Sequence, residues 1–184
     1  MIILGIDPGS RFLGYGVISV ENSRLKAIDY GVLKFAAEVP LSQRLHEIGV
    51  GVQELFKKFQ PAHVSLEKIF LGKNADSAFK LGHARGVIIY EALLANCEVH
   101  EYATRVVKKG IVGNGGADKE HVRTVVCNLL QIPILKSLDA SDALAMACYH
   151  SSQLKVIQIK EKMKTQLKTQ LKMQTKRPLE KGAV

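Results

Sequence analysis

The strongest constraint on the fold is a change of hydrophobic period along the chain. Residues 2–7, 13–20 and 25–35 are short runs rich in apolar and β-branched residues, each ended by turn residues, and they predict three strands. Over residues 41–59 the apolar side chains instead recur every three or four positions, which predicts an amphipathic helix that stops before Pro61. Because the three strands are joined by short turns, the chain is expected to open as an antiparallel meander.

Strands and helices alternate after Pro61. Two further strands are predicted at residues 63–66 and 98–102, and helices are predicted at about 76–95, at 104–110, after Asp118 and at about 140–151. This order predicts an α/β fold, in which a mixed β-sheet of three antiparallel strands followed by parallel strands is flanked by helices on both faces. Right-handed crossovers allow the first and fourth strands to lie side by side.

The positive charge of the chain is concentrated at its C-terminal end. The formal net charge is +9 for 184 residues, yet residues 153–184 hold nine Lys/Arg and only two acids. Residues 1–152 therefore carry a net charge of only +2, and net charge alone does not identify them as a nucleic-acid binder. We expect one globular domain over residues 1–152 and a basic, low-complexity tail over 153–184, solvated and partly helical, with an accessory DNA-phosphate contact as the alternative role.

Several classes of protein are disfavoured by composition. No apolar run reaches the roughly 20 residues needed to span a membrane, and Asp7 interrupts the apolar N-terminus too early for a signal peptide. The three cysteines are odd in number and widely spaced, so they fit neither a disulfide framework nor a zinc site, and buried free thiols are expected at Cys97, Cys127 and Cys148. A cytoplasmic protein with a packed core is the expectation.

Four carboxylates carry the predicted chemistry. Asp7 ends the first strand, and Glu67 ends a strand expected beside it, at the carboxyl edge where open α/β sheets usually bind ligands. Asp139 and Asp142 are three residues apart at the start of the last helix, so they share one face of it. If that helix starts near the strand ends, all four acids converge.

Converging carboxylates repel one another and favour divalent cations. Mg²⁺ prefers carboxylate and water oxygens, and two ions about 3.5–4 Å apart can clamp the attacking and leaving oxygens of a phosphoryl displacement. Taken singly, each acid also has an ordinary structural interpretation: Asp7 as a turn residue, Glu67 as an exposed strand end, Asp139 as a helix cap and Asp142 as a favourable charge near the helix dipole. The four together are much stronger evidence than any one.

Ordered motifs resemble the RuvC-type Holliday-junction resolvases, a family with a ribonuclease-H-like fold. The matching segments are GIDPGS at 5–10, GYG at 14–16, LEKIF at 66–70, KNADSA at 73–78, LGHARG at 81–86, RVVK at 105–108, VGNGGADK at 112–119 and DASDALA at 139–145. They follow one another over about residues 1–150 without a large gap. The resemblance therefore covers the predicted domain and leaves the tail aside.

The resemblance implies specific roles. Asp7, Glu67, Asp139 and Asp142 take the positions of the family's metal-binding catalytic acids, with two Mg²⁺ ions expected and Mn²⁺ as a substitute. It also implies DNA contacts by four residues: Phe70 at bases near the junction centre, Lys108 and Lys119 near the cut phosphate, and Lys73 in the same loop as Phe70. From the residues alone, Phe70 could equally pack in a core or interface, and both later lysines could be surface residues.

The resemblance further implies a homodimer that nicks two opposing strands of four-way junction DNA, leaving 5′-phosphate and 3′-hydroxyl ends, in recombination and repair. It also implies cooperation with the RuvA–RuvB branch-migration complex. Three alternatives stay open at this point. They are a sugar-kinase or actin-like ATPase domain, whose first Asp-Gly turn is similar, a non-catalytic junction-binding protein, and a ribonuclease-H-like nuclease for RNA–DNA hybrids.

Overall fold

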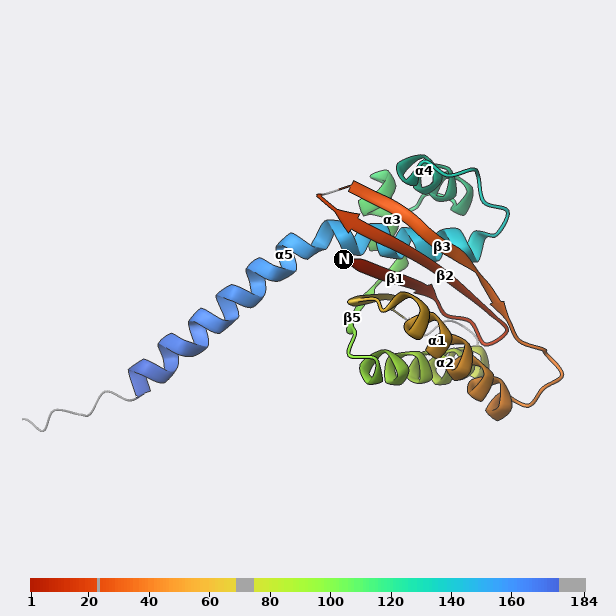
Figure 1. Cartoon of the computed structure of the whole chain (residues 1–184), viewed down its shortest axis with the longest axis horizontal. Helices are drawn as coiled ribbons and strands as arrows, with labels where there is room; N and C mark the ends of the chain where they lie inside the picture. Colours follow the sequence, from red (N-terminus) through yellow and green to blue (C-terminus); the bar gives the residue numbers. More distant parts are fainter. Residues whose placement is uncertain (23, 69–74, 176–184) are drawn as a thin grey trace, which may run out of the picture. The chain divides into compact units, whose positions relative to one another are not determined.

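The computed structural model describes residues 1–22, 24–68 and 75–175 (Figure 1). The strands and helices follow in the order β1 Ile2–Asp7, β2 Phe12–Glu21, β3 Arg24–Lys34, α1 Leu41–Phe59, β4 His63–Glu67, α2 Ala75–Leu94, β5 Glu98–Tyr102, α3 Thr104–Val112, α4 Lys119–Leu130 and α5 Leu138–Thr175. Their types and order are those predicted from the hydrophobic periods.

Within the described residues the strands form one five-stranded mixed sheet in the order β3-β2-β1-β4-β5. β1 and β2 pair antiparallel, as do β2 and β3, whereas β4 pairs parallel with both β1 and β5. The predicted α/β class is confirmed, including the placement of the first and fourth strands side by side. Helices α1 and α2 cover one face of this sheet, and α3, α4 and the first turns of α5 lie on the other (Figure 1).

The two faces of the central strands differ in character. Side chains of β1 and β4 that point toward α1 and α2 are large and apolar, and they join the main core: Leu4, Ile6, Val64, Leu66. Because side chains alternate along a strand, the neighbouring positions face α5 instead. On β4 these positions are His63, Ser65 and Glu67, and the Ser65 hydroxyl donates a hydrogen bond of 3.0 Å to the carbonyl of Met146 in α5.

Glycines on the α5 face let the helix approach the sheet closely. A Cβ added to Gly5 would overlap the Ala143 carbonyl oxygen, and one added to Gly14 would overlap that of Asp139. At Gly16 an added Cβ would lie 2.7 Å from Leu144, which is closer than packed atoms tolerate. The small residues of β1 and β2 thus make the contact between sheet and helix possible.

Helix ends mostly follow the sequence signals. α1 ends at Phe59, with Gln60 in the left-handed conformation before Pro61, and Asp118 caps α4 by accepting a 2.7 Å hydrogen bond from the His121 backbone N–H. α5 differs from the prediction of a helix over residues 140–151, because it begins at Leu138 and continues to Thr175. The lysine-rich sequence after residue 151 lacks Gly or Pro until Pro178, so nothing in it breaks the helix.

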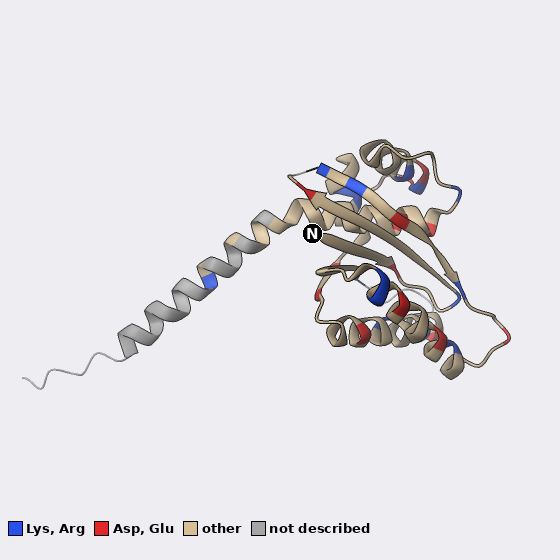
Figure 2. Ribbon diagram, in the orientation of Figure 1, with Lys and Arg blue, Asp and Glu red and all other residues tan. Residues whose placement is uncertain are grey.

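The chain divides into two compact units, Met1–Ser151 and Ser152–Val184. In the first unit, basic and acidic residues both occur on the sheet and on the helices (Figure 2). All three cysteines are buried and free, as predicted. In the portion of the chain that is described, no helix combines the length and the apolar character required to cross a bilayer.

We expect Gly5→Ala to destabilise the protein by about 2–3 kcal/mol, because the new methyl group meets the backbone of α5, which a side-chain rotation cannot relieve. Urea unfolding of the two proteins measures this difference. Gly116→Ala is the matched control, because its Cβ would meet only the Asn114 side chain, at 3.5 Å. Equal stability losses in both variants would contradict the close-packing interpretation.

Candidate active site

Two of the predicted acids lie at the carboxyl ends of neighbouring parallel strands. Ile6 of β1 is paired with Leu66 of β4, so the residues that follow them, Asp7 and Glu67, are neighbours at the same sheet edge. Both also lie on the sheet face that α5 covers. The alternation of the strands and their register therefore bring these two carboxylates together.

A cavity of about 80 Å³ opens beside these acids. It is lined by residues from β1, β4, α3, α4 and α5: Asp7, Glu67, Thr104, Val107, Lys108, Lys119, Val122, Asp142, Ala145 and Met146. Three of the four predicted acids and two of the predicted lysines thus share one cavity. Its lining combines apolar side chains with polar groups that come from separate elements.

Asp139 stands beside this group and is not among the residues that line the cavity. Its backbone packs on Gly14, the strand residue paired with Asp7. Its charge still acts on Asp7, whose pKa it raises. The predicted helix spacing therefore puts Asp142 into the cavity and Asp139 at its border.

Two of the three carboxylates that line the cavity, those of Glu67 and Asp142, have defined partners. The Lys119 ammonium donates a 2.5 Å hydrogen bond to Asp142, and the Thr104 hydroxyl donates to the Glu67 carboxylate. The Arg85 guanidinium donates a 3.1 Å hydrogen bond to the Glu67 backbone carbonyl and pairs with the Glu101 carboxylate. These contacts fix the end of β4 and the orientation of its acid.

Lys108 links two of the helices that line the cavity. Its ammonium group donates a 2.6 Å hydrogen bond to the carbonyl of Ala117, just before the Asp118 cap of α4. Gly113, in the left-handed conformation, ends α3 and starts the turn between the two helices. The lysine thereby ties α3 to the start of α4, where Lys119 enters the cavity.

Asp7 is the electrostatic centre of the site. Burial, followed by the nearby charges of Glu67 and Asp142, raises the pKa of Asp7 to about 8, and Lys119 partly opposes this. Burial lowers the pKa of Lys119, but the hydrogen bond and charge of Asp142 outweigh it, so the net shift is upward. A carboxyl group that is protonated at neutral pH among other acids is the arrangement that a divalent cation would relieve.

The donors in this cavity suit a hard cation. Carboxylate oxygens from two strand ends and a helix are the ligands that Mg²⁺ prefers, and neither a thiol nor an imidazole lines the cavity. Asp7, Glu67 and Asp142 are therefore the residues that would hold it, with Asp139 close by. The identity of the ion stays a prediction.

Two residues with a clear role in the geometry were missed by sequence reasoning, and two predicted ones cannot be placed. Arg85 belongs to the LGHARG motif but received no role from the sequence; only 15% of its side chain is exposed, and it supports Glu67. Thr104 follows the end of β5, and the rule that located Glu67 at this sheet edge could have found it. Phe70 and Lys73 lie outside the described residues.

The comparisons with known proteins agree with this geometry. Residues 3–150 match the family model of crossover junction endodeoxyribonuclease RuvC. A RuvC from Bdellovibrio bacteriovorus is 53% identical over 155 residues, which cover 84% of this chain and 92% of the relative.

Two solved structures of Thermus thermophilus RuvC also match. One has a TM-score of 0.78 and 31% identity, and the other, a complex with a Holliday junction substrate, has a TM-score of 0.77 and 28% identity. Each comparison covers 85% of this chain and 96% of the solved chain.

The mixed sheet, with its acid-lined cavity at the strand ends, places the chain in the ribonuclease-H-like class of resolvases. The chain belongs to the RuvC family of crossover junction endodeoxyribonucleases. The resemblance seen in the sequence motifs is thus confirmed, and the sugar-kinase or actin-like ATPase alternative is wrong.

Without divalent metal, Asp7→Asn should become progressively more stable than the wild type as the pH rises. Because the folded-state pKa of Asp7 is raised from 3.8 to about 8, its contribution to stability is present below pH 3.8 and is lost as the pH rises toward 8. Asparagine stays neutral throughout. Each kcal/mol gained should raise Tm by about 2–4 °C.

Thermal unfolding in chelator at pH 5 and pH 8.5 measures the effect. Asp29→Asn, on β3 away from the cavity, is the matched control for replacing an aspartate. A stability difference between Asp7→Asn and wild type that is the same at both pH values would refute the raised pKa.

Proposed function

We propose that this protein is a DNA endonuclease that resolves Holliday junctions by nicking two opposing strands symmetrically, leaving 5′-phosphate and 3′-hydroxyl ends. The observation that carries the proposal is the convergence of Asp7, Glu67 and Asp142 with Lys119 in one cavity. Family membership supports the substrate, because a related structure holds a Holliday junction.

The four acids are proposed as ligands for two Mg²⁺ ions, with Mn²⁺ able to substitute. When bound, such ions supply an activated water and stabilise the leaving oxygen in phosphodiester hydrolysis. Asp7 must release the proton that its raised pKa retains before it binds a cation, so cation binding at Asp7 should strengthen as the pH rises toward 8. Thr104 holds the Glu67 carboxylate in one orientation through its hydrogen bond.

The lysines of the cavity are proposed as phosphate contacts. Lys119 lies at the first position of α4, where backbone N–H groups and the helix dipole also favour an anion. Lys108 approaches from α3 and lines the same cavity. Phe70 is proposed to engage bases near the junction centre, and Lys73, in the same loop, to contact DNA.

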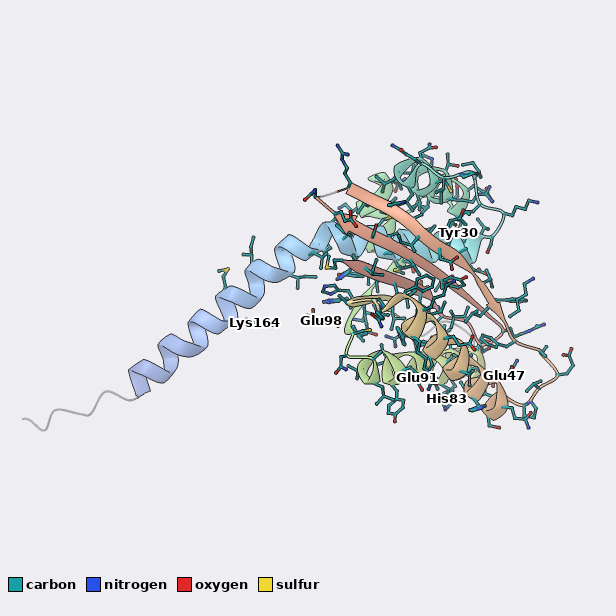
Figure 3. All side chains as sticks on the ribbon, viewed as in Figure 1. Tyr30, Glu47, His83, Glu91, Glu98 and Lys164 are labelled. Atoms are coloured by element: carbon teal, nitrogen blue, oxygen red, sulfur yellow. The ribbon has the colours of Figure 1, made fainter. Side chains whose placement is uncertain are left out.

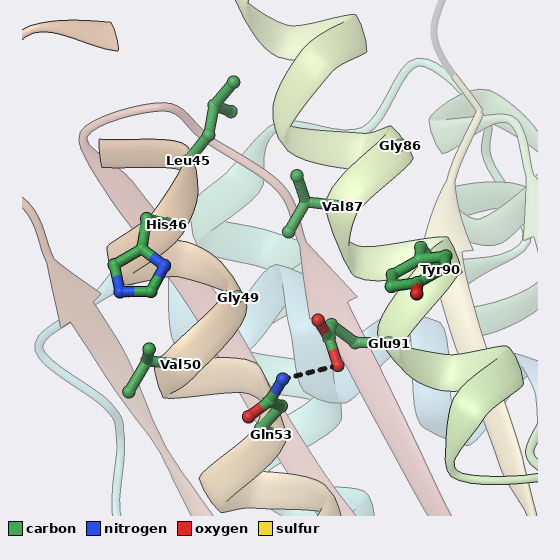
Figure 4. A pocket seen from close by; sticks show the side chains of 9 residues that line it. All are labelled: Leu45, His46, Gly49, Val50, Gln53, Gly86, Val87, Tyr90 and Glu91. Atoms are coloured by element: carbon green, nitrogen blue, oxygen red, sulfur yellow. Dashed lines mark hydrogen bonds between the residues drawn. The ribbon is translucent and has the colours of Figure 1, made fainter. Parts of the chain in front are cut away.

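The protein is also proposed to act as a homodimer, since a two-fold dimer presents two sites to a two-fold junction. α2 carries a stripe of exposed apolar side chains, Phe79, Tyr90 and Leu93, which are 60–70% exposed. Beside it lies a pocket of about 440 Å³, whose lining includes Leu45 and Val50 of α1 and Val87 of α2 (Figure 4). An exposed apolar stripe next to a pocket is typical of a protein interface.

We extend the proposal to cellular context by family resemblance. The dimer would work with the RuvA–RuvB branch-migration complex on cytoplasmic DNA. The domain over residues 1–152 would carry the nuclease activity, and the basic tail over 153–184 would be a separate segment. Nine Lys/Arg in that tail suit an accessory contact with DNA phosphates.

Asp7→Asn should lower the rate of junction cleavage by ~10³-fold or more, because it removes a cation ligand whose effect is worth several kcal/mol. The assay compares a synthetic mobile four-way junction with a matched linear duplex and an RNA–DNA hybrid, each with Mg²⁺ or chelator. Asp29→Asn should cleave like the wild type.

Paired nicks in the junction alone, lost in chelator and in Asp7→Asn, are the expected result. Junction binding without cleavage in any metal would favour the non-catalytic junction-binding alternative. Preferred cleavage of the hybrid would favour the hybrid-nuclease alternative, and either outcome would overturn the proposal.

Tyr90→Glu should weaken the dimer at least about tenfold, because it puts a charge into the apolar stripe. Sedimentation equilibrium measures the change in dissociation constant. Ile134→Glu is the control, because Ile134 is also exposed, at 52%, but lies between α4 and α5. If Ile134→Glu alone produced monomers, the interface would have to lie elsewhere.

A further inference from the structure

Three histidines gather on the α5 face of the sheet, away from the acids. His63 begins β4, His100 lies in the middle of β5 and His150 comes from α5, and one ring nitrogen of each lies within 4.8 Å of the other two. The side chains of His63 and His100 are only 13% and 18% exposed, and His150 is fully buried. Among the described residues, this is the one group of three or more His, Cys, Asp or Glu side chains whose candidate ligand atoms all lie within 4.8 Å of one another.

Glu98 completes a triangle of donor atoms. His63 Nδ1 and His100 Nε2 are 3.4 Å apart, and Glu98 Oε2 lies 3.5 Å from each of them. Ligands of tetrahedral zinc, at bonds of about 2.0–2.1 Å, are separated from one another by roughly 3.3 Å. The triangle therefore already has nearly the dimensions of one face of a zinc tetrahedron.

His150 brings a third imidazole to the group, with one ring nitrogen within 4.8 Å of a ring nitrogen of His63 and of His100. Its Nδ1 is hydrogen-bonded to the Tyr102 hydroxyl at 2.7 Å, while its Nε2 is buried without a hydrogen-bond partner among the described residues. A metal-binding histidine almost always uses its second ring nitrogen in such a bond, which fixes its tautomer and orientation. An imidazole with one nitrogen anchored and the other buried and unpartnered is prepared for a ligand.

The histidine most deeply buried is also neutral. Burial, and then the charges of His100 and His63, lower the pKa of His150 to about 3, so at neutral pH it keeps a lone pair. Burial, with Tyr149 adding to it, raises the pKa of Tyr102 to about 12, which keeps the anchoring hydroxyl protonated.

We propose that His63, His100, His150 and Glu98 form a binding site for one zinc-type divalent cation. Nitrogen donors select late first-row ions over Mg²⁺, so the site differs in chemistry from the all-carboxylate cavity. Glu98 stands at the start of β5 (Figure 3), and 61% of its side chain is exposed. The bound ion would join β4, β5 and α5 at the end opposite the acids.

Cobalt(II) tests the site, because in four-coordinate nitrogen-rich surroundings it absorbs strongly in the visible, whereas in a carboxylate and water site it does not. The full-length protein, with excess Mg²⁺ present, is titrated with cobalt and then with zinc. We expect one equivalent of cobalt to give an intense visible band that zinc abolishes. The Asp7→Asn variant should give the same band, which separates this site from the acid cavity.

Variants identify the ligands. Glu98→Gln and His100→Gln should each weaken cobalt binding by about 10–100-fold or more, and Tyr102→Phe should weaken it about 10-fold by releasing the His150 ring. His46→Gln, at an exposed histidine of α1, is the matched control and should bind like the wild type. Because Glu98 is largely exposed, its variant is expected to fold, and circular dichroism checks this.

Two results would overturn the proposal. One is a wild type that shows no intense band at any cobalt concentration up to saturation of the acid cavity. The other is a band that Glu98→Gln and His100→Gln leave unchanged but Asp7→Asn removes. Neither result depends on nuclease activity, so the failure of this site and the failure of the proposed function remain distinguishable.

Discussion

The close packing of α5 on the glycines of β1 and β2 is the contact on which the rest of the site depends. At Gly5 and Gly14, any side chain would push against the backbone carbonyls of Ala143 and Asp139, so the helix can approach only because these positions have none. Close approach brings the start of α5 to the carboxyl ends of β1 and β4. There Asp142 of the helix lines the same cavity as Asp7. Because neither backbone can rotate away, this contact sets the distance between α5 and the sheet more tightly than a contact between flexible side chains would.

The residues of β4 and α5 that face each other recur at matching intervals along the two elements. Glu67, Ser65 and His63 alternate on one strand face over ~13 Å, and Asp142, Met146 and His150 follow one stripe of the helix over ~12 Å. The two spacings are nearly equal, so each strand residue has a helix counterpart. Ser65 bonds to Met146 midway. Carboxylates gather at one end of this ladder and imidazoles at the other, which keeps two incompatible kinds of donor apart.

Much of the fold and part of the site were predictable from the sequence, because they depend on local rules. Alternation and turns gave the strands, and the parallel pairing of β1 with β4 placed Asp7 beside Glu67. The last helix was predicted to end near residue 151, although the sequence holds no Gly or Pro from there until Pro178, and α5 continues to Thr175. The support of Glu67 by Arg85 was not predicted, because it joins residues from different elements. The histidine cluster was missed for a similar reason: its members are 37 and 50 residues apart and become neighbours only through sheet order. The roles of Phe70 and Lys73 stay predictions.

The ion pair between Lys119 and Asp142 links the two kinds of charge that the cavity is suited to receive. While they bond to each other, the lysine is less available to an anion and the carboxylate less available to a cation. A cation at Asp142 would free Lys119, and an anion at Lys119 would free Asp142, so each ligand removes part of the cost of binding the other. Such coupling is reciprocal by thermodynamic necessity: whatever factor one ligand adds to the affinity for the second, the second adds to the affinity for the first. A single short contact would thus make the binding of a cation and of an anion in the cavity cooperative.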